Sequence, residues 1–61
     1  MPEAEFEIFK DVSGKFRFRL KAPNGEIIAT SEAYVSKDGC KNGIESVRTY
    51  APKAKISDLT I

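Results

Sequence analysis

The feature that most constrains this chain is a strict alternation of apolar and basic residues from residue 16 to residue 21. In the run FRFRLK, two phenylalanines and a leucine alternate with two arginines and a lysine. A period of two is typical of a strand with one buried face. The turn sequence Pro23-Asn24-Gly25 follows, so Gly14–Ser31 is predicted to form a hairpin around which the rest of the chain is organised.

The length of 61 residues predicts one small domain, residues 1–61. A chain of this size buries only about 60% of its unfolded surface, so its core is small. Cys40 is the single cysteine and the chain has no histidine, which excludes an intrachain disulfide and leaves a structural zinc site without ligands. Oligomerisation is the remaining source of stability.

Composition excludes several classes of protein. Ten basic and nine acidic residues leave a net charge of +1, far from the balance of a dedicated nucleic-acid binder. The N-terminal sequence MPEAEFEIF is acidic where a signal peptide is basic, and no apolar stretch approaches the ~20 residues of a membrane span. We therefore expect a soluble cytoplasmic protein with no membrane partner.

Residues Glu5–Lys10 are predicted to form a first strand with Phe6 and Ile8 on one face. Residues directly opposite each other in a hairpin share a face, so the favoured register is the one that separates apolar from charged side chains. It sets Phe6 and Ile8 opposite the apolar residues of the 16–21 run and the glutamates near its basic ones. This register requires a loop of odd length around Ser13-Gly14.

The second hairpin has two possible registers. A three-residue loop with a bulge at Gly25 sets Ala22 opposite Glu26 and Leu20 opposite Ile28, and leaves Ile27 and Ala29 on the charged face. A loop of even length instead places Ile27 and Ala29 inside, with Lys21 opposite Glu26. Turn chemistry favours the first.

A helix is predicted from Lys37 to Tyr50, with Ser36 as its N-cap. Its apolar residues recur every three or four positions and form one face: Cys40, Ile44, Val47 and Ala51. Gly43 costs roughly 1 kcal/mol in a helix interior, and its lack of a side chain would permit a close approach of another element. Pro52 ends the helix near Tyr50-Ala51.

The segment Lys55–Ile61 is predicted to form a last strand, with Ile56, Leu59 and Ile61 apolar. The order of elements is then strand, strand, strand, helix, strand. This is an α+β fold, a two-layer βββαβ unit in which antiparallel hairpins are covered by one helix.

Three stretches carry a resemblance to a known family: FRFRLK followed by NGEIIA, and KNGIESV within the predicted helix. In this order they resemble the YegP-like family of small bacterial and archaeal proteins. The resemblance implies a βββαβ unit used as tandem repeats or as two subunits that share a sheet and exchange C-terminal strands. For a chain with one unit it implies a homodimer, and it supplies no established activity or catalytic residues.

No group of residues predicts catalysis. Cys40 has no histidine to act as a base, so we expect a buried packing role. The acidic residues are scattered among basic ones, and no pair has a spacing that suggests acid–base chemistry. We predict no enzyme activity, no catalytic residues, no metal, no cofactor and no small-molecule ligand.

Two surfaces are candidates for binding. Ile56, Leu59 and Ile61 form the candidate dimer interface, because one helix about 10 Å wide cannot cover a four-stranded sheet about 15–20 Å wide. Arg17, Arg19 and Lys21 are candidate nucleic-acid contacts near the aromatic Phe9, although Glu5, Glu7 and Glu26 are expected to neutralise them. The favoured function is a small, non-catalytic dimeric interaction module, and the alternative is a weak nucleic-acid binder.

Overall fold

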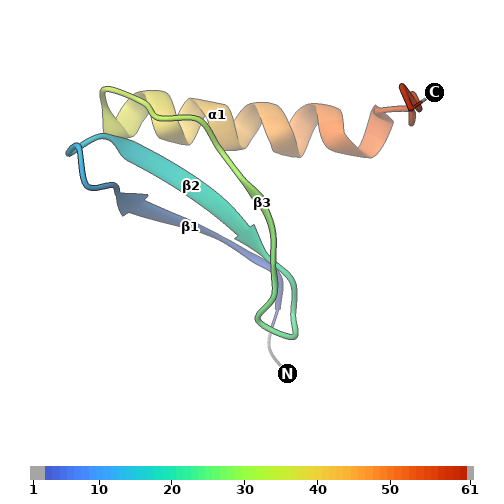
Figure 1. Cartoon of the computed structure of the whole chain (residues 1–61), viewed down its shortest axis with the longest axis horizontal. Coiled ribbons are helices and arrows are strands. Elements are labelled where there is room, and N and C mark those ends of the chain that lie inside the picture. Colours follow the sequence, from blue (N-terminus) through green and yellow to red (C-terminus); the bar gives the residue numbers. More distant parts are fainter. Residues whose placement is uncertain (1–2, 61) are drawn as a thin grey trace.

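The computed structural model describes residues 3–60, which form three antiparallel strands followed by one long helix (Figure 1). The sheet order is β1-β2-β3. This arrangement confirms the predicted α+β class. None of the helices in residues 3–60 is long and apolar enough to cross a membrane. The elements are β1 (Glu5–Lys10), β2 (Phe16–Lys21), β3 (Ile27–Thr30), α1 (Lys37–Tyr50) and the short 3-10 helix η1 (Ala51–Lys53).

The first hairpin has the predicted register. Phe6 lies opposite Leu20 and Ile8 opposite Phe18, while Glu7 lies opposite Arg19. The loop covers residues 11–15, an odd number, and Gly14 has a φ of 83°, a conformation that glycine adopts without strain. Separation of apolar from charged side chains was therefore sufficient to predict this pairing.

The second hairpin combines the predicted turn with an unpredicted bulge. The Ala22 amide donates to the Glu26 carbonyl at 2.8 Å across the three-residue turn. Between Leu20 and Lys21, however, the register shifts: Lys21 pairs with Ile27 and Leu20 with Ala29. The predicted pairing of Leu20 with Ile28 was wrong, as was the placement of Ala29 on the charged face, because one extra residue in a strand reverses the face of the residues beyond it.

Beyond β3 the chain continues alongside β2. The Ser31 amide donates to the Phe18 carbonyl at 2.8 Å, and Phe16 and Tyr34 exchange two backbone hydrogen bonds of 2.8 and 2.7 Å. The Ser31 hydroxyl also accepts from the Phe18 amide at 2.9 Å. These bonds carry the chain along β2 to the start of α1 and position the Tyr34 ring next to the helix.

The core lies between β2 and α1. Phe18 is 6% exposed and Cys40 is fully buried, as predicted. The Phe6 ring meets Phe18 edge-on at 5.8 Å between centroids, and the Tyr34 ring stacks on Phe18 at 6.3 Å. Aromatic pairs at these separations stabilise a core beyond the area that they bury. Because few side chains are fully buried, these contacts carry much of the stability.

Both ends of α1 lie where the sequence predicts. The Ser36 hydroxyl accepts from the Gly39 amide at 3.0 Å and caps the first turn. The helix ends at Tyr50, two residues before Pro52. Ala51, predicted to extend the buried face, is instead exposed, because it begins η1 beyond the reach of the sheet.

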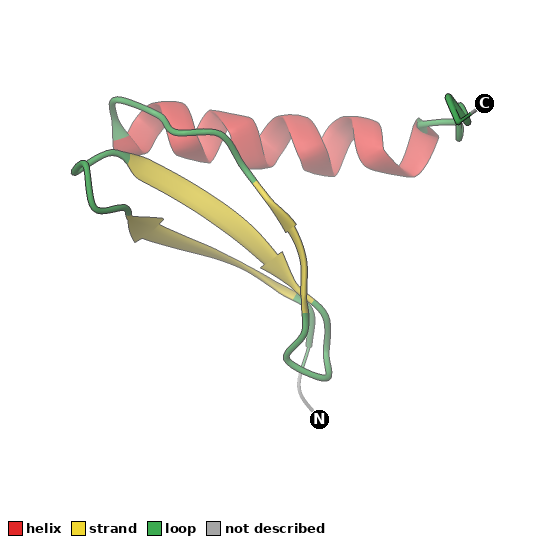
Figure 2. Ribbon diagram, viewed as in Figure 1, coloured by secondary structure: helices red, strands yellow, loops and turns green. Residues whose placement is uncertain are grey.

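The segment after η1 departs from the predicted last strand. Residues Lys55–Thr60 form no strand in this chain, and Ile61 lies outside the described residues (Figure 2). The helix and the sheet diverge toward the end of α1, so the chain leaves the helix far from both sheet edges (Figure 1). Residues 54–60 are exposed and are called the C-terminal arm below.

Candidate interaction surface

The divergence of α1 from the sheet opens a cavity of about 260 Å³ between them, called the wedge pocket below. β1 and β2 contribute Phe6 and Leu20 to its lining, and β3 contributes Ala29. Val47 lines it from α1, and Tyr34 lines it from the segment before the helix. The wedge pocket is therefore an open apolar extension of the core.

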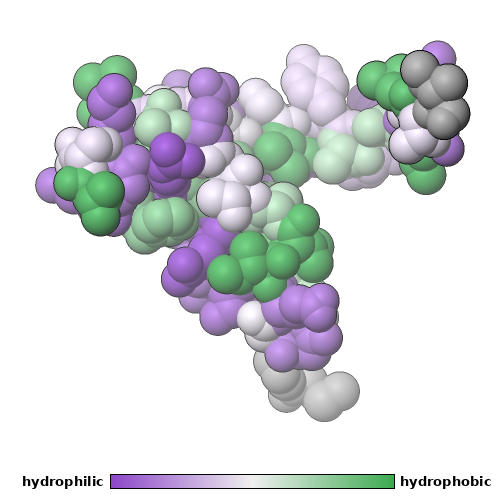
Figure 3. All heavy atoms as spheres, viewed as in Figure 1, coloured by the Kyte–Doolittle hydropathy of each residue, from purple (hydrophilic) through white to green (hydrophobic). Residues whose placement is uncertain are grey.

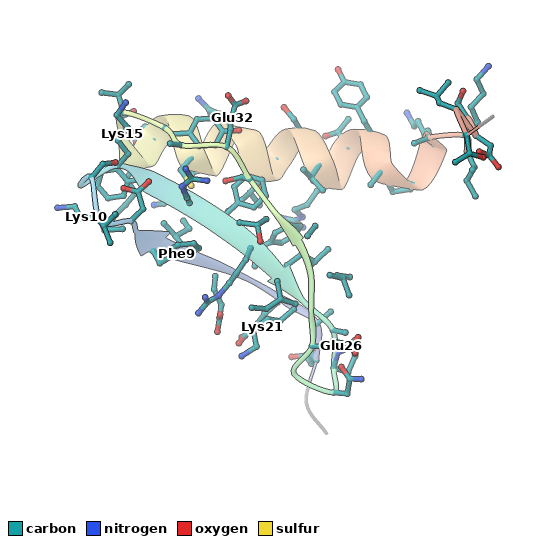
Figure 4. The ribbon with its side chains drawn as sticks, viewed as in Figure 1. Phe9, Lys10, Lys15, Lys21, Glu26 and Glu32 are labelled. Carbon is teal, nitrogen blue, oxygen red and sulfur yellow. The ribbon has the colours of Figure 1, made fainter. Side chains whose placement is uncertain are left out.

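Glu32 is the acidic side chain in the lining of the wedge pocket. It lies on the segment that connects β3 to α1 (Figure 4). Glu32 is exposed, and within residues 3–60 its carboxylate takes part in no ion pair or side-chain hydrogen bond. The rim of an apolar pocket thus carries an uncompensated negative charge.

The C-terminal arm exposes large apolar side chains. Ile56 is 96% and Leu59 86% exposed, and Figure 3 shows apolar surface at this end of the chain and over β3. In β3 itself, Ile27 and Ile28 are at least half exposed. The candidate dimer residues Ile56 and Leu59 are therefore free in this chain, and the wedge pocket that could accept such side chains is open.

The opposite face of the sheet carries the candidate nucleic-acid contacts. Phe9 and Lys21 lie on the side that faces away from α1 (Figure 4). Arg19 Nε donates to Glu7 Oε1 at 2.7 Å, and Lys21 Nζ donates to Glu7 Oε2 at 3.4 Å. The hydrogen bond from Arg19 is the main cause of a lowered pKa at Glu7, so this carboxylate stays charged beside its two cations.

Arg17 pairs with Asp11, a partner that the sequence analysis did not identify. Arg17 Nε donates to Asp11 Oδ2 at 2.8 Å, while Asp11 Oδ1 accepts from the amides of Ser13 and Lys15 at 2.9 and 3.0 Å. These bonds, led by the one from Arg17, hold the pKa of Asp11 well below its usual range. An aspartate at the start of a turn that contains Ser and Gly was the available signal.

The three candidate cations are neutralised, as predicted, but only one of the three predicted glutamates takes part. Glu7 and Asp11 compensate the three cations, whereas Glu5 and Glu26 form no ion pair within residues 3–60. The Phe9 ring is also occupied, because the Arg19 guanidinium lies 4.9 Å from its centroid.

Chemical sites have little support in the described part of the chain. Burial raises the pKa of the Cys40 thiol, which disfavours the reactive thiolate. Residues 3–60 contain no cluster of three or more Cys, Asp or Glu side chains that could hold a metal ion. The open apolar surfaces are the features of residues 3–60 that require an explanation.

A model of the domain of unknown function DUF1508 matches residues 11–58. The chain belongs to this family. The DUF1508 chain is 64% identical over 55 residues to a UPF0339 protein of Treponema denticola, an alignment that covers 90% of this chain and 95% of that protein. It is 47% identical over 53 residues to the UPF0339 protein YegP of Yersinia pestis, covering 87% of this chain and 47% of YegP. The resemblance to the YegP-like family is thereby confirmed.

A solved structure has the same fold. The solution structure of a protein from Haloferax volcanii matches with a TM-score of 0.86 and 46% identity, covering 95% of this chain and 98% of that one. The relatives thus include proteins of this length and, in YegP, a protein about twice as long. Family membership identifies the fold, while the function of the family is unknown.

Proposed function

We propose that this protein is a small, non-catalytic interaction module that acts as a homodimer, whose two subunits share one sheet and exchange the segment Lys55–Ile61. One observation carries the proposal: a single chain leaves both an apolar pocket and an apolar arm exposed. Exposed apolar surface of this kind marks an interaction site. Two copies would allow each arm to cover the other copy's pocket.

The apolar core of a single chain is small. Only Phe18 and Cys40 are buried apolar residues in the described chain. Burying a side chain such as Ile56 or Leu59 contributes roughly 1.5–3 kcal/mol, and a symmetric dimer makes each contact twice. For a domain with a stability of about 5 kcal/mol, this contribution is decisive.

The lengths of the relatives support the same proposal. YegP of Yersinia pestis, of which this chain covers 47%, has room for a second unit of similar size. Two units in one protein, or two copies of a one-unit chain, would each cover the apolar surface that a single unit leaves exposed. In the sheet that residues 3–60 form, the outer edge of β3 has no neighbouring strand and offers a place for an added one.

Light scattering tests the proposal directly. We expect about twice the chain mass of 6.8 kDa at micromolar concentration. A chain truncated after Lys53 is expected to lose both the dimer and cooperative folding, because its stability depends on the partner. A full-length chain that is a folded monomer at this concentration would contradict the proposal.

A second candidate function is weak nucleic-acid binding through Arg17, Arg19 and Lys21. Its basis is a sheet face that α1 does not cover and that holds three cations and Phe9. The ion pairs to Glu7 and Asp11 reduce the positive potential of this face, which makes it the weaker candidate. Binding to a mixed oligonucleotide pool at low salt, falling steeply as salt rises, would favour this function over the first.

A further inference from the structure

We propose that Asn24 is a site of self-modification: in the folded protein its side chain cyclises with the Gly25 amide and then opens to aspartate or isoaspartate. Asn42, which also precedes a glycine, is protected by α1. The inference does not depend on the proposed homodimer. It assigns a covalent chemistry to the turn between β2 and β3, which the proposed function does not use.

The chain contains two side-chain amides, and both have the same neighbour. It has no glutamine, and its two asparagines form the pairs Asn24-Gly25 and Asn42-Gly43. Glycine has no Cβ, so the main-chain nitrogen that follows each asparagine is unhindered, and the backbone adopts unusual conformations at low cost. The sequence alone therefore predicts the same chemistry at both positions.

The reaction needs water as its only co-reactant. The Gly25 nitrogen attacks Cγ of Asn24 within one chain, a C–N bond forms, and the side-chain nitrogen leaves as ammonia with the proton that the Gly25 nitrogen gives up. The product is a succinimide ring, and no atom is oxidised or reduced. Water then adds to one of the ring carbonyls and breaks its C–N bond. Cleavage of the new bond gives aspartate, and cleavage of the original peptide bond gives isoaspartate.

The turn around Asn24 activates the side-chain carbonyl. Exposure does not distinguish the two asparagines, because both are exposed. At Asn24, however, Oδ1 accepts a hydrogen bond from the Glu26 amide at 3.0 Å. A donor in this position stabilises the negative charge that develops on the oxygen when a nucleophile attacks the carbonyl. The fold thus supplies the electrophilic half of the site.

The attacking nitrogen is held by an exposed turn alone. The Gly25 amide donates to the Ala22 carbonyl at 2.8 Å, and this bond opens before the attack. Gly25 is exposed, and a Cβ added to it would have no neighbouring atom within 4 Å. Figure 4 shows Glu26 at the tip of this hairpin, away from α1. Few contacts are lost when such a turn opens, so the opening costs little free energy.

Asn42 lies in a part of the chain that resists the same change. Gly43 is an interior residue of α1, where the backbone amides form the helical hydrogen bonds. A Cβ on residue 43 would lie 2.9 Å from Tyr34 Cζ and 3.1 Å from Phe18 Cε2, so the helix backbone is packed against the core here. Ring closure would rotate the backbone out of its helical conformation and away from these rings. The tertiary structure therefore makes one pair reactive and protects the other.

The modification changes the second hairpin. Either product carries a carboxylate at residue 24, two residues before Glu26. Isoaspartate also moves the side-chain methylene into the main chain, inside a turn closed by the 2.8 Å bond from the Ala22 amide to the Glu26 carbonyl. Because turn length fixes the register of a hairpin, isoaspartate disturbs the pairing at the start of β3. The enzyme class that fits the product is a carboxyl methyltransferase specific for isoaspartate.

Peptide mapping of the full chain tests the proposal. The folded protein would be incubated at mildly alkaline pH and digested with trypsin, which cleaves after Lys21 and Lys41 and so separates the two asparagines into residues 22–37 and 42–48. Mass spectrometry gives the fraction of each peptide in which the amide has become a carboxylate, with a zero-time sample as the baseline. We expect conversion at Asn24 to be at least about tenfold faster than at Asn42, because α1 has to open before Asn42 reacts. In guanidinium chloride the two rates should agree within about threefold, because neither pair is then structured.

Asn24→Gln and Asn42→Gln are matched variants, since each keeps an amide but lengthens the side chain so that the succinimide ring cannot form. Asn24→Gln should abolish the conversion of residues 22–37 and the labelling of this peptide by an isoaspartate-specific methyltransferase with labelled S-adenosylmethionine. Asn42→Gln should retain both. Native conversion of Asn42 at the rate of Asn24 or faster would overturn the protection by α1. An unconverted Asn24 in the folded protein, over a time in which the unfolded chain converts, would overturn the site itself.

Discussion

The Tyr34 ring lies against α1 at Gly43, so close that a Cβ on residue 43 would be 2.9 Å from Tyr34 Cζ. The Cβ on residue 43 would also be 3.1 Å from Cε2 of Phe18. The predicted close approach at Gly43 is thereby confirmed. A glycine costs roughly 1 kcal/mol in a helix interior, and here it lets two aromatic rings of the core approach the helix backbone.

Replacing Gly43 by alanine should therefore destabilise the protein, although alanine is the better helix former. Overpacking a well-filled site typically costs 1–3 kcal/mol, which exceeds the gain in helix propensity. Urea unfolding would measure the difference. Gly39→Ala, in the same helix, is the comparison: its Cβ would lie 3.3 Å from the Ser36 hydroxyl, a tight contact that a shift of a few tenths of an ångström relieves, so its loss of stability should be smaller. Equal or higher stability of Gly43→Ala would show that the Tyr34 ring moves aside freely.

Phe18→Ala should destabilise the domain by about 3–5 kcal/mol, the range for truncation of a core aromatic. Phe18 contacts the rings of both Phe6 and Tyr34, so its loss leaves a cavity at the centre of the core. Thermal unfolding followed by circular dichroism would measure the loss. Val12→Ala, at a fully exposed position, should change the stability by less than about 0.5 kcal/mol. If both variants melt alike, β2 buries its other face.

Cys40 should react slowly with a thiol reagent in the native protein and at an ordinary rate in denaturant. Its side chain is fully buried, and burial raises the pKa of the thiol. The labelling rate would be compared with that of a Cys40→Ala variant carrying Ser46→Cys, which places the thiol at an exposed position of the same helix. Similar native rates for the two thiols would disprove the assignment of the buried helix face.

Stability should fall in acid through Asp11. Its pKa in the folded state is depressed, chiefly by the bond from Arg17, below the ordinary value of 3.8. The unfolded state therefore takes up a proton more readily, and the stabilisation present above pH 3.8 is lost as the pH falls below it.

Melting temperatures of the parent and Asp11→Asn, measured between about pH 2 and 7 across the range where carboxylates titrate, would test this expectation. The variant should be less stable at neutral pH and should lose less stability in acid. Glu26→Gln, at a residue without an ion pair in the described chain, is the control and should keep the parent's pH dependence. An unchanged pH profile for Asp11→Asn would contradict the role of the Arg17–Asp11 pair.

Local patterns were sufficient for much of the fold and for part of the candidate interaction surface. The alternation in β2 predicts its buried face, and the Ser36 cap and Pro52 predict the bounds of α1. These features depend on residues close in the chain. The Arg17–Asp11 pair was missed, because a turn aspartate can bond its own backbone or a nearby cation, and here it does both.

The wedge pocket and the C-terminal arm depend on the tertiary structure. The bulge between Leu20 and Lys21 moves Ala29 to the apolar face, and the angle between α1 and the sheet opens the pocket. The sequence by itself determined the spacing of Ile56, Leu59 and Ile61, from which a last strand was predicted, and residues 55–60 form no strand in this chain. Whether such a segment pairs within its own chain depends on which sheet edge lies within its reach, and α1 carries it away from both edges.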